Sequence, residues 1–212
     1  MSKNLLCFVS HIDDFEISCL GYIFKHKHDY DKIYCIIATT WEAKKNIWQQ
    51  NLELIEKEAK IKILYINLEF EQRKLQTSFD EAKDKFYKAI DFNKSSRFDI
   101  LTHDSNDCHT DHVATHAIAK GLYKYADRFT TIYSPSLANF NANYWIGLTD
   151  EQYDLKKSLL DKYDINVEQS YTKLGYYLQS NQHYDIGSIY YIESFVHSDH
   201  KHHECYKILK WS

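Results

Sequence analysis

The sequence is poor in glycine and proline. Five glycines and one proline occur among 212 residues, well below the usual shares of about 7% and about 5%. Neither Gly-x-Gly-x-x-Gly nor Gly-x-x-x-x-Gly-Lys-Ser/Thr is present, and these are the loops that wrap phosphate in common nucleotide-binding folds. A glycine-rich phosphate loop is therefore excluded.

Long apolar runs and an excess of basic residues are also missing. No stretch approaches the roughly 18 consecutive apolar residues of a membrane-spanning helix. The 26 basic side chains face 30 acidic ones, giving a net charge of −4, whereas a nucleic-acid-binding protein carries a basic excess. We expect no membrane span and no nucleic-acid partner. Hydrophobic residues make up 44% of the chain, which excludes disorder, and the length fits one domain, residues 1–212.

The five cysteines include no Cys-x-x-Cys pair, and their number is odd. The first ten residues, MSKNLLCFVS, run directly into charged residues, without the apolar core or cleavage site of a secretion signal. Both features predict reduced thiols and a cytoplasmic protein.

Short apolar runs alternate with longer amphipathic stretches along the chain. They predict strands at 5–9, 33–38, 61–66, 98–102 and 130–133, and helices at 17–24, 44–60, 79–92 and 113–126. This alternation is typical of right-handed crossovers in a sheet with helices on both faces. We therefore predict a Rossmann-like, mostly parallel α/β fold. Beyond it, the pattern predicts a helix at 150–163, begun by Thr149, and a strand at 186–192.

Two polar clusters follow the first and the fourth predicted strand. The first is SHIDD at residues 10–14, and the second is HDSNDCHTDH at residues 103–112. Ligands of open α/β sheets bind beyond the carboxyl ends of the strands, where both clusters lie. Two histidine–carboxylate groups that leave parallel strands at the same edge can converge on one metal ion.

The residue types in these clusters suit metal-assisted hydrolysis. Catalytic zinc takes three protein ligands, often two histidines and a carboxylate, and keeps one position for water. His11, one carboxylate of the Asp13–Asp14 pair and His112 supply that set. The second carboxylate is then free to act as a base. His109, three residues before His112, suits an oxyanion donor or a general acid.

The remaining histidines are interpreted as structural or solvated. His116 can share a helix face with His112, but His11 and an aspartate already complete the ligand set. Four further histidines lie between residues 197 and 203, in a polar segment with no predicted strand or helix to hold them. A transition-metal site, or adventitious metal binding, is the alternative for that segment.

Residues 11–16 read HIDDFE, and residues 107–112 read DCHTDH. They resemble the His-Pro-Asp-Asp-Glu and Asp-x-His-Pro-Asp-His motifs of the PIG-L/LmbE-like zinc-dependent N-acetylglucosaminyl deacetylases. Thr39-Thr40 after the second predicted strand and YIESF at residues 191–195 extend the resemblance over most of the chain. Ile12, Phe15 and Thr110 replace the two motif prolines and the glutamate, but none of these positions is a ligand or the base.

The resemblance implies a zinc ion, with ferrous iron or another divalent metal as alternatives, held by His11, Asp14 and His112. Asp13 would be the general base. His109 would stabilise the tetrahedral intermediate or protonate the leaving amine. The implied reaction removes acetyl from an N-acetyl amino sugar that is free, nucleotide-linked or otherwise conjugated.

Further residues enter through the same resemblance. Asp111 would orient a histidine from behind, as metal-bound imidazoles require, and Glu193 would line the site. Residues 44–51 lack the family's usual Arg-x-x-Glu pattern, which often helps to place substrate, so the sugar itself is not specified. The oligomeric state is open, with a homo-oligomer among the alternatives.

Two other functions compete with deacetylation. One is an iron oxygenase in which His11, Asp13 and a distant histidine bind the metal, although such sites usually lie on jelly rolls with few helices. The other is a non-catalytic sugar- or metal-binding module on the same fold. The intact ligand set and Asp13 speak against it.

Overall fold

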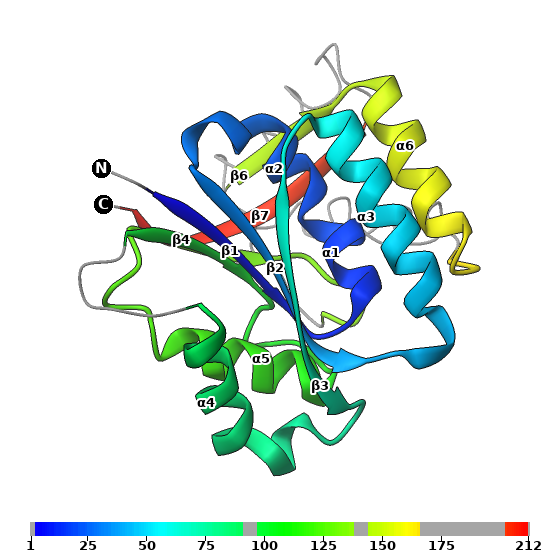
Figure 1. The fold of residues 1–212 in the computed structure, drawn as a ribbon. Coiled ribbons are helices and arrows are strands. Elements are labelled where there is room, and N and C mark those ends of the chain that lie inside the picture. Colours follow the sequence, from blue (N-terminus) through cyan, green and yellow to red (C-terminus); the bar gives the residue numbers. More distant parts are fainter. Residues whose placement is uncertain (1–2, 91–96, 138–143, 166–201, 212) are drawn as a thin grey trace, which may run out of the picture.

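The computed structural model describes residues 3–90, 97–137, 144–165 and 202–211 (Figure 1). Its strands form one sheet in the order β3-β2-β1-β4-β5-β7-β6. The strands are β1 (Asn4–Val9), β2 (Lys32–Thr40), β3 (Ile63–Glu71), β4 (Phe98–Thr102), β5 (Arg128–Ile132), β6 (Tyr144–Leu148) and β7 (His202–Trp211). The helices are α1 (Ile12–Ser18), α2 (Leu20–His26), α3 (Lys45–Ala59), α4 (Phe79–Ala89), α5 (Thr110–Lys120) and α6 (Asp150–Asp161), with short 3₁₀ turns η1 (Lys27–Asp29), η2 (Glu42–Lys44) and η3 (Leu75–Ser78).

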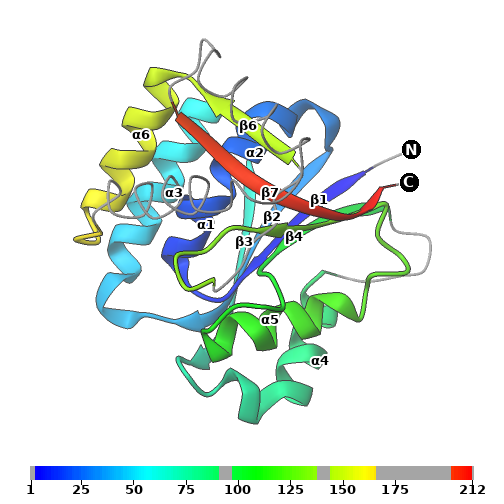
Figure 2. The same ribbon diagram turned by 180° about the vertical axis from the view of Figure 1, so that it is seen from behind.

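The predicted mostly parallel α/β fold is confirmed. Strands β3, β2, β1, β4 and β5 pair in parallel. Strand β7 then pairs antiparallel with both β5 and β6, and Figure 2 shows it running between them. These last two strands were not predicted.

Both faces of the parallel sheet are covered, which explains the continuous apolar runs of its strands. In β1, Leu5, Cys7 and Val9 join the core under α1, α2, α3 and α6. Leu6 and Phe8 alternate with them and join the core under α4 and α5. Figure 1 shows these two groups of helices on opposite sides of the sheet.

The helix predicted at 17–24 begins five residues earlier and is interrupted. It consists of α1 and α2, which meet at Cys19. His11 precedes the first turn with extended backbone, and the Asp14 carboxylate accepts the His11 N–H over 2.8 Å. An acidic first turn stabilises a helix N-terminus. Asp13 and Asp14 therefore lie in the first turn of α1.

Other boundaries shift by a few residues. Helix α5 begins at Thr110 instead of 113 and ends at Lys120 instead of 126, which places the second polar cluster at its N-terminus. Strand β3 runs from Ile63 to Glu71, beyond the predicted 61–66. Helix α6 begins as predicted, with Thr149 Oγ1 accepting the Gln152 N–H over 3.2 Å.

The histidine-rich segment needs a correction. His202 and His203 begin β7, so part of this segment is held in the sheet, whereas the sequence indicated neither strand nor helix. Residues 197–201 and the predicted strand at 186–192 lie outside the described residues. Within the ranges that the structure covers, every helix is too short or too polar to cross a bilayer.

Candidate active site

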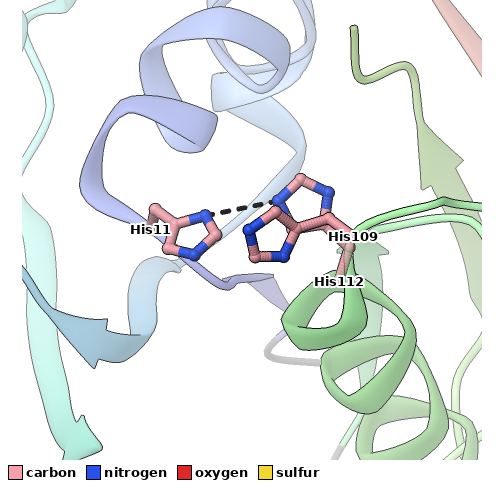
Figure 3. Close-up of side chains that lie close together, drawn as sticks. All are labelled: His11, His109 and His112. Atoms are coloured by element: carbon pink, nitrogen blue, oxygen red, sulfur yellow. Dashed lines mark hydrogen bonds between the residues drawn. The ribbon is translucent and has the colours of Figure 1, made fainter. Parts of the chain in front are cut away.

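The two polar clusters meet at one edge of the sheet because β1 and β4 are parallel neighbours, with Phe8 opposite Thr102. His11 follows β1 at the start of α1, and His109 and His112 belong to the N-terminal end of α5. Figure 3 shows the His11 imidazole facing those of His109 and His112, which lie together at the start of α5. His11 Nδ1 lies 3.3 Å from His112 Nε2.

A carboxylate oxygen completes this arrangement. Asp14 Oδ2 lies 3.1 Å from His11 Nδ1 and 3.3 Å from His112 Nε2. The three donor atoms thus form a nearly equilateral triangle. Ligands at about 2.0–2.1 Å from a tetrahedral zinc ion lie about 3.3–3.4 Å apart, so the donor set fits such an ion.

Other side chains bring further donor atoms close to this triangle. Three overlapping groups each place their donors within 4.8 Å of one another. They are His11–His109–His112, Asp14–His103–His112 and His11–Asp13–Asp14. The structure therefore brings together five of the predicted site residues. It adds His103, to which the sequence analysis gave no role.

Asp111, which the resemblance implies as a residue that orients a histidine, lies next to His11. Its Oδ2 is 3.4 Å from His11 Nε2, so Nδ1 is the ring nitrogen turned toward Asp14. Asp111 also accepts the backbone N–H groups of Arg73 over 2.6 Å and of Leu75 over 3.3 Å. The loop after β3 therefore supports His11 through Asp111.

Asp107 supports His112 in the same way, and this role was missed. Its Oδ2 lies 2.9 Å from His112 Nδ1, and its Oδ1 accepts the His109 N–H over 2.8 Å. Both ligand histidines of the predicted set are thus backed by a carboxylate, the arrangement that fixes the tautomer and orientation of metal-bound imidazoles. The only signal in the sequence was the place of Asp107 at the head of the second motif.

The electrostatic field between the histidines favours a cation. Burial alone would lower the pKa of His11 and His112. The charge of Asp14 and the hydrogen bonds to surrounding carboxylates together outweigh burial, and the pKa values rise to about 10 for His11 and about 9 for His112. Conversely, burial would raise the pKa of Asp14, but His112, His103 and His11 hold it well below its usual range. A metal ion at this point would take the place of those protons.

The pKa of Asp13 shifts in the opposite direction from that of its neighbour Asp14. Burial and the Asp14 charge raise the pKa of Asp13 to about 6, and the charge of His11 opposes them. A carboxylate with a pKa near the working pH is well matched to accept a proton during catalysis. The surroundings therefore shift the pKa values of the two adjacent aspartates in opposite directions.

His109 faces the same space as a neutral donor. It caps α5, with Nδ1 accepting the Asp111 N–H over 3.2 Å, so the proton of the neutral ring sits on Nε2. Burial and the charges of His112 and His11 lower its pKa. Its ring centroid lies 4.7 Å from that of His11 and 4.6 Å from that of His112.

Comparison with known proteins identifies the family. Residues 6–123 match the model of the PIG-L family, described as GlcNAc-PI de-N-acetylase. The chain belongs to the PIG-L family. No curated protein matches the sequence.

Solved structures share the PIG-L fold at low sequence identity. The N,N'-diacetylchitobiose deacetylase from Pyrococcus horikoshii has a TM-score of 0.65 and 15% identity, over 98% of this chain and 84% of that one. The zinc-inhibited form of teicoplanin deacetylase has a TM-score of 0.60 and 10% identity, over 97% of both chains. GalB, a 4-carboxy-2-hydroxymuconate hydratase from Pseudomonas putida KT2440, has a TM-score of 0.63 and 12% identity, over 99% and 96%.

Two histidines behind the site have structural contacts. His103 Nε2 accepts the Ser10 N–H over 3.0 Å, and its ring stacks on His112 with centroids 3.7 Å apart. Burial and His112 lower its pKa to about 4, so it is a neutral ring. His116 lies 2.7 Å from the His103 carbonyl oxygen, outside the donor triangle. Glu193 lies outside the described residues.

Proposed function

We propose that this chain is a metal-dependent N-deacetylase, a hydrolase of a linear amide C–N bond, with residues 1–212 acting as one domain. The proposed substrate is an N-acetyl amino sugar, free, nucleotide-linked or otherwise conjugated. The observation that carries the proposal is the triangle of His11 Nδ1, Asp14 Oδ2 and His112 Nε2, with sides of 3.1–3.3 Å. Membership of a de-N-acetylase family supports the type of reaction.

In this proposal, His11, Asp14 and His112 hold the divalent metal, zinc or ferrous iron. When bound, the metal supplies a Lewis acid for the acetyl carbonyl and lowers the pKa of a water molecule. Asp107 and Asp111 keep the two imidazoles oriented.

The protein side chains handle the protons. Asp13 accepts a proton from the water that attacks the acetyl carbon, and the tetrahedral intermediate forms. His109 donates a hydrogen bond from its Nε2–H to the oxyanion. This negative charge develops only as the reaction reaches its transition state. Asp13 then passes the proton it took from water to the amide nitrogen, and the C–N bond breaks, releasing acetate and the amine. The lowered pKa of His109 favours a neutral hydrogen-bond donor over a proton donor.

Two alternative functions would give different results in the test described below. GalB has a similar fold and is a hydratase, so the fold alone does not select the reaction. An iron oxygenase would use Asp13 as the ligand, whereas the short triangle contains Asp14. A sugar-binding module without turnover would bind metal and ligand but release no acetate.

The test is a screen of N-acetyl amino sugars and their nucleotide conjugates for released acetate and primary amine, alongside metal analysis. We expect turnover with at least one member, and loss of most metal in His11→Ala and His112→Ala. The histidines between residues 197 and 203 should be replaced by glutamine to remove adventitious binding, because deleting them would remove the first residues of β7. Full metal occupancy in both alanine variants would refute the ligand assignment. Bound metal without acetate release across the screen would refute deacetylation.

A further inference from the structure

The segment after β5 reaches the site without belonging to either motif. Ser134 is buried and Ser136 is half-buried, and both hydroxyls contact the Asp107 carboxylate. Ser134 Oγ lies 2.7 Å from Oδ2, and Ser136 Oγ lies 2.5 Å from Oδ1. The two hydroxyls are themselves 2.7 Å apart. The two serine hydroxyls have only two protons for these three short contacts. One proton at most can lie between the two serine oxygens, so at least one hydroxyl donates a hydrogen bond to the Asp107 carboxylate.

The same oxygens surround one nitrogen of His112. Asp107 Oδ2 is 2.9 Å from His112 Nδ1, and the hydroxyl oxygens of Ser134 and Ser136 are each 3.4 Å from it. Three oxygen acceptors around one nitrogen stabilise a proton there. The lone pair of the neutral ring is then on Nε2, the atom that faces Asp14 and His11.

The backbone makes this segment stiff. Pro135, the only proline of the chain, lies between the two serines, fixing its own φ and favouring extended backbone at Ser134. Ser136 N–H donates to Ser134 Oγ over 3.2 Å, and the Ser136 carbonyl accepts the Cys108 N–H over 3.1 Å. The serines are thus fixed relative to the loop that carries Asp107.

We propose that Ser134 and Ser136 are positioning residues of the metal centre. They hold Asp107 so that its carboxylate keeps the proton of His112 on Nδ1 and presents Nε2 as the ligand atom. The inference rests on the proposed function, since it assumes a metal at the triangle. It adds a third segment, the one that follows β5, to the two motifs that build the site.

The test measures metal affinity instead of turnover. Zinc affinity is determined by competition with a chelator, and the visible absorption of the cobalt-loaded protein reports the ligand geometry. Loss of an outer partner of a metal ligand typically weakens metal binding about 10- to 100-fold. We expect Asp107→Asn to fall within that range and the Ser134→Ala/Ser136→Ala double variant to lose about 10-fold, with an altered cobalt spectrum.

Matched variants separate positioning from general destabilisation. Ser136→Thr keeps the hydroxyl and should retain zinc affinity, whereas Ser136→Val, whose side chain is nearly isosteric with that threonine, should lose it. This pair also decides the question if the double variant does not fold. Thr131→Val removes a hydroxyl that donates to the neighbouring buried Asp104 over 2.8 Å. It should lower the free energy of unfolding without changing zinc affinity.

The possible results distinguish failure of the positioning role from failure of the proposed function. Wild-type zinc affinity and cobalt spectrum in the double variant and in Ser136→Val, with weakened binding in Asp107→Asn, would overturn the positioning role alone. A wild-type protein that binds neither zinc nor cobalt would overturn the proposed function, and this inference with it.

Discussion

Glu16 tests how burial next to the site affects the ionisation of a carboxyl group. Its side chain in α1 is fully buried. Oε1 accepts the Asn51 Nδ2–H over 2.8 Å and the Tyr163 O–H over 3.2 Å, and Oε2 has no partner among the described residues. Glu16→Gln keeps the shape and both hydrogen bonds to Oε1 but can never ionise.

The sign of the effect follows from the pKa. Burial raises the pKa of Glu16 from 4.5 to about 8, although the Asn51 and Tyr163 hydrogen bonds oppose it. Between these values the unfolded chain releases the proton and the folded protein keeps it, so the wild type loses stability as the pH rises from about 4.5 to about 8. One pKa unit corresponds to about 1.4 kcal/mol. Glu16→Gln should therefore gain about 3–5 kcal/mol over the wild type between pH 5 and pH 9.

Denaturant unfolding of the metal-free proteins at pH 5, 7 and 9 measures this difference. The nearby histidines titrate in both proteins, so their contribution cancels. Glu58→Gln, on the exposed side of α3, is the control and should track the wild type at every pH. A constant difference between Glu16→Gln and wild type across the range would show that Glu16 is ionised and compensated in the fold, contrary to this reasoning.

Three further predictions concern the site and the core. Asp13→Asn should bind zinc normally and lose about 100- to 10,000-fold in turnover, measured by acetate release; loss of the metal instead would favour the oxygenase ligand set. His109→Ala should keep metal and substrate binding and lose about 100- to 1000-fold in turnover. An unchanged turnover number would make it structural. Phe86→Ala removes a buried ring stacked on Phe8 at 4.2 Å and should cost about 3–5 kcal/mol, seen as a lower denaturant midpoint at unchanged slope. A cost under 1 kcal/mol would contradict the packing.

The sequence predicted best where burial decides the structure. Strand β4 was predicted residue for residue at 98–102, because its apolar residues are buried on both faces. The meeting of His11 with His112 followed from topology alone, since adjacent parallel strands end at one edge. Their roles as ligands stay predictions.

The other features were not predicted, because they depend on contacts that local sequence patterns do not reveal. Strand β7 combines histidine, lysine and aromatic residues without an apolar run, and its place is set by pairing with β5 and β6. The Ser134-Pro135 pair indicated only the end of a strand. Its contact with Asp107 depends on β5 lying next to β4, which single-sequence reasoning did not use. The start of α1 at Ile12 was hidden because charged residues occupy its first turn.

The position of β7 between β5 and β6 has a consequence for how the chain folds while it is being synthesised. Every described site residue lies before residue 138, so a nascent chain of that length already carries the five parallel strands and both motifs. Strand β6 is synthesised next, but its only partner among the described residues is β7, more than fifty residues later. During that interval the open edges of β5 and β6 are exposed to pairing with other chains. The site can thus assemble early, while protection of these open edges during synthesis waits for β7, the last strand among the described residues.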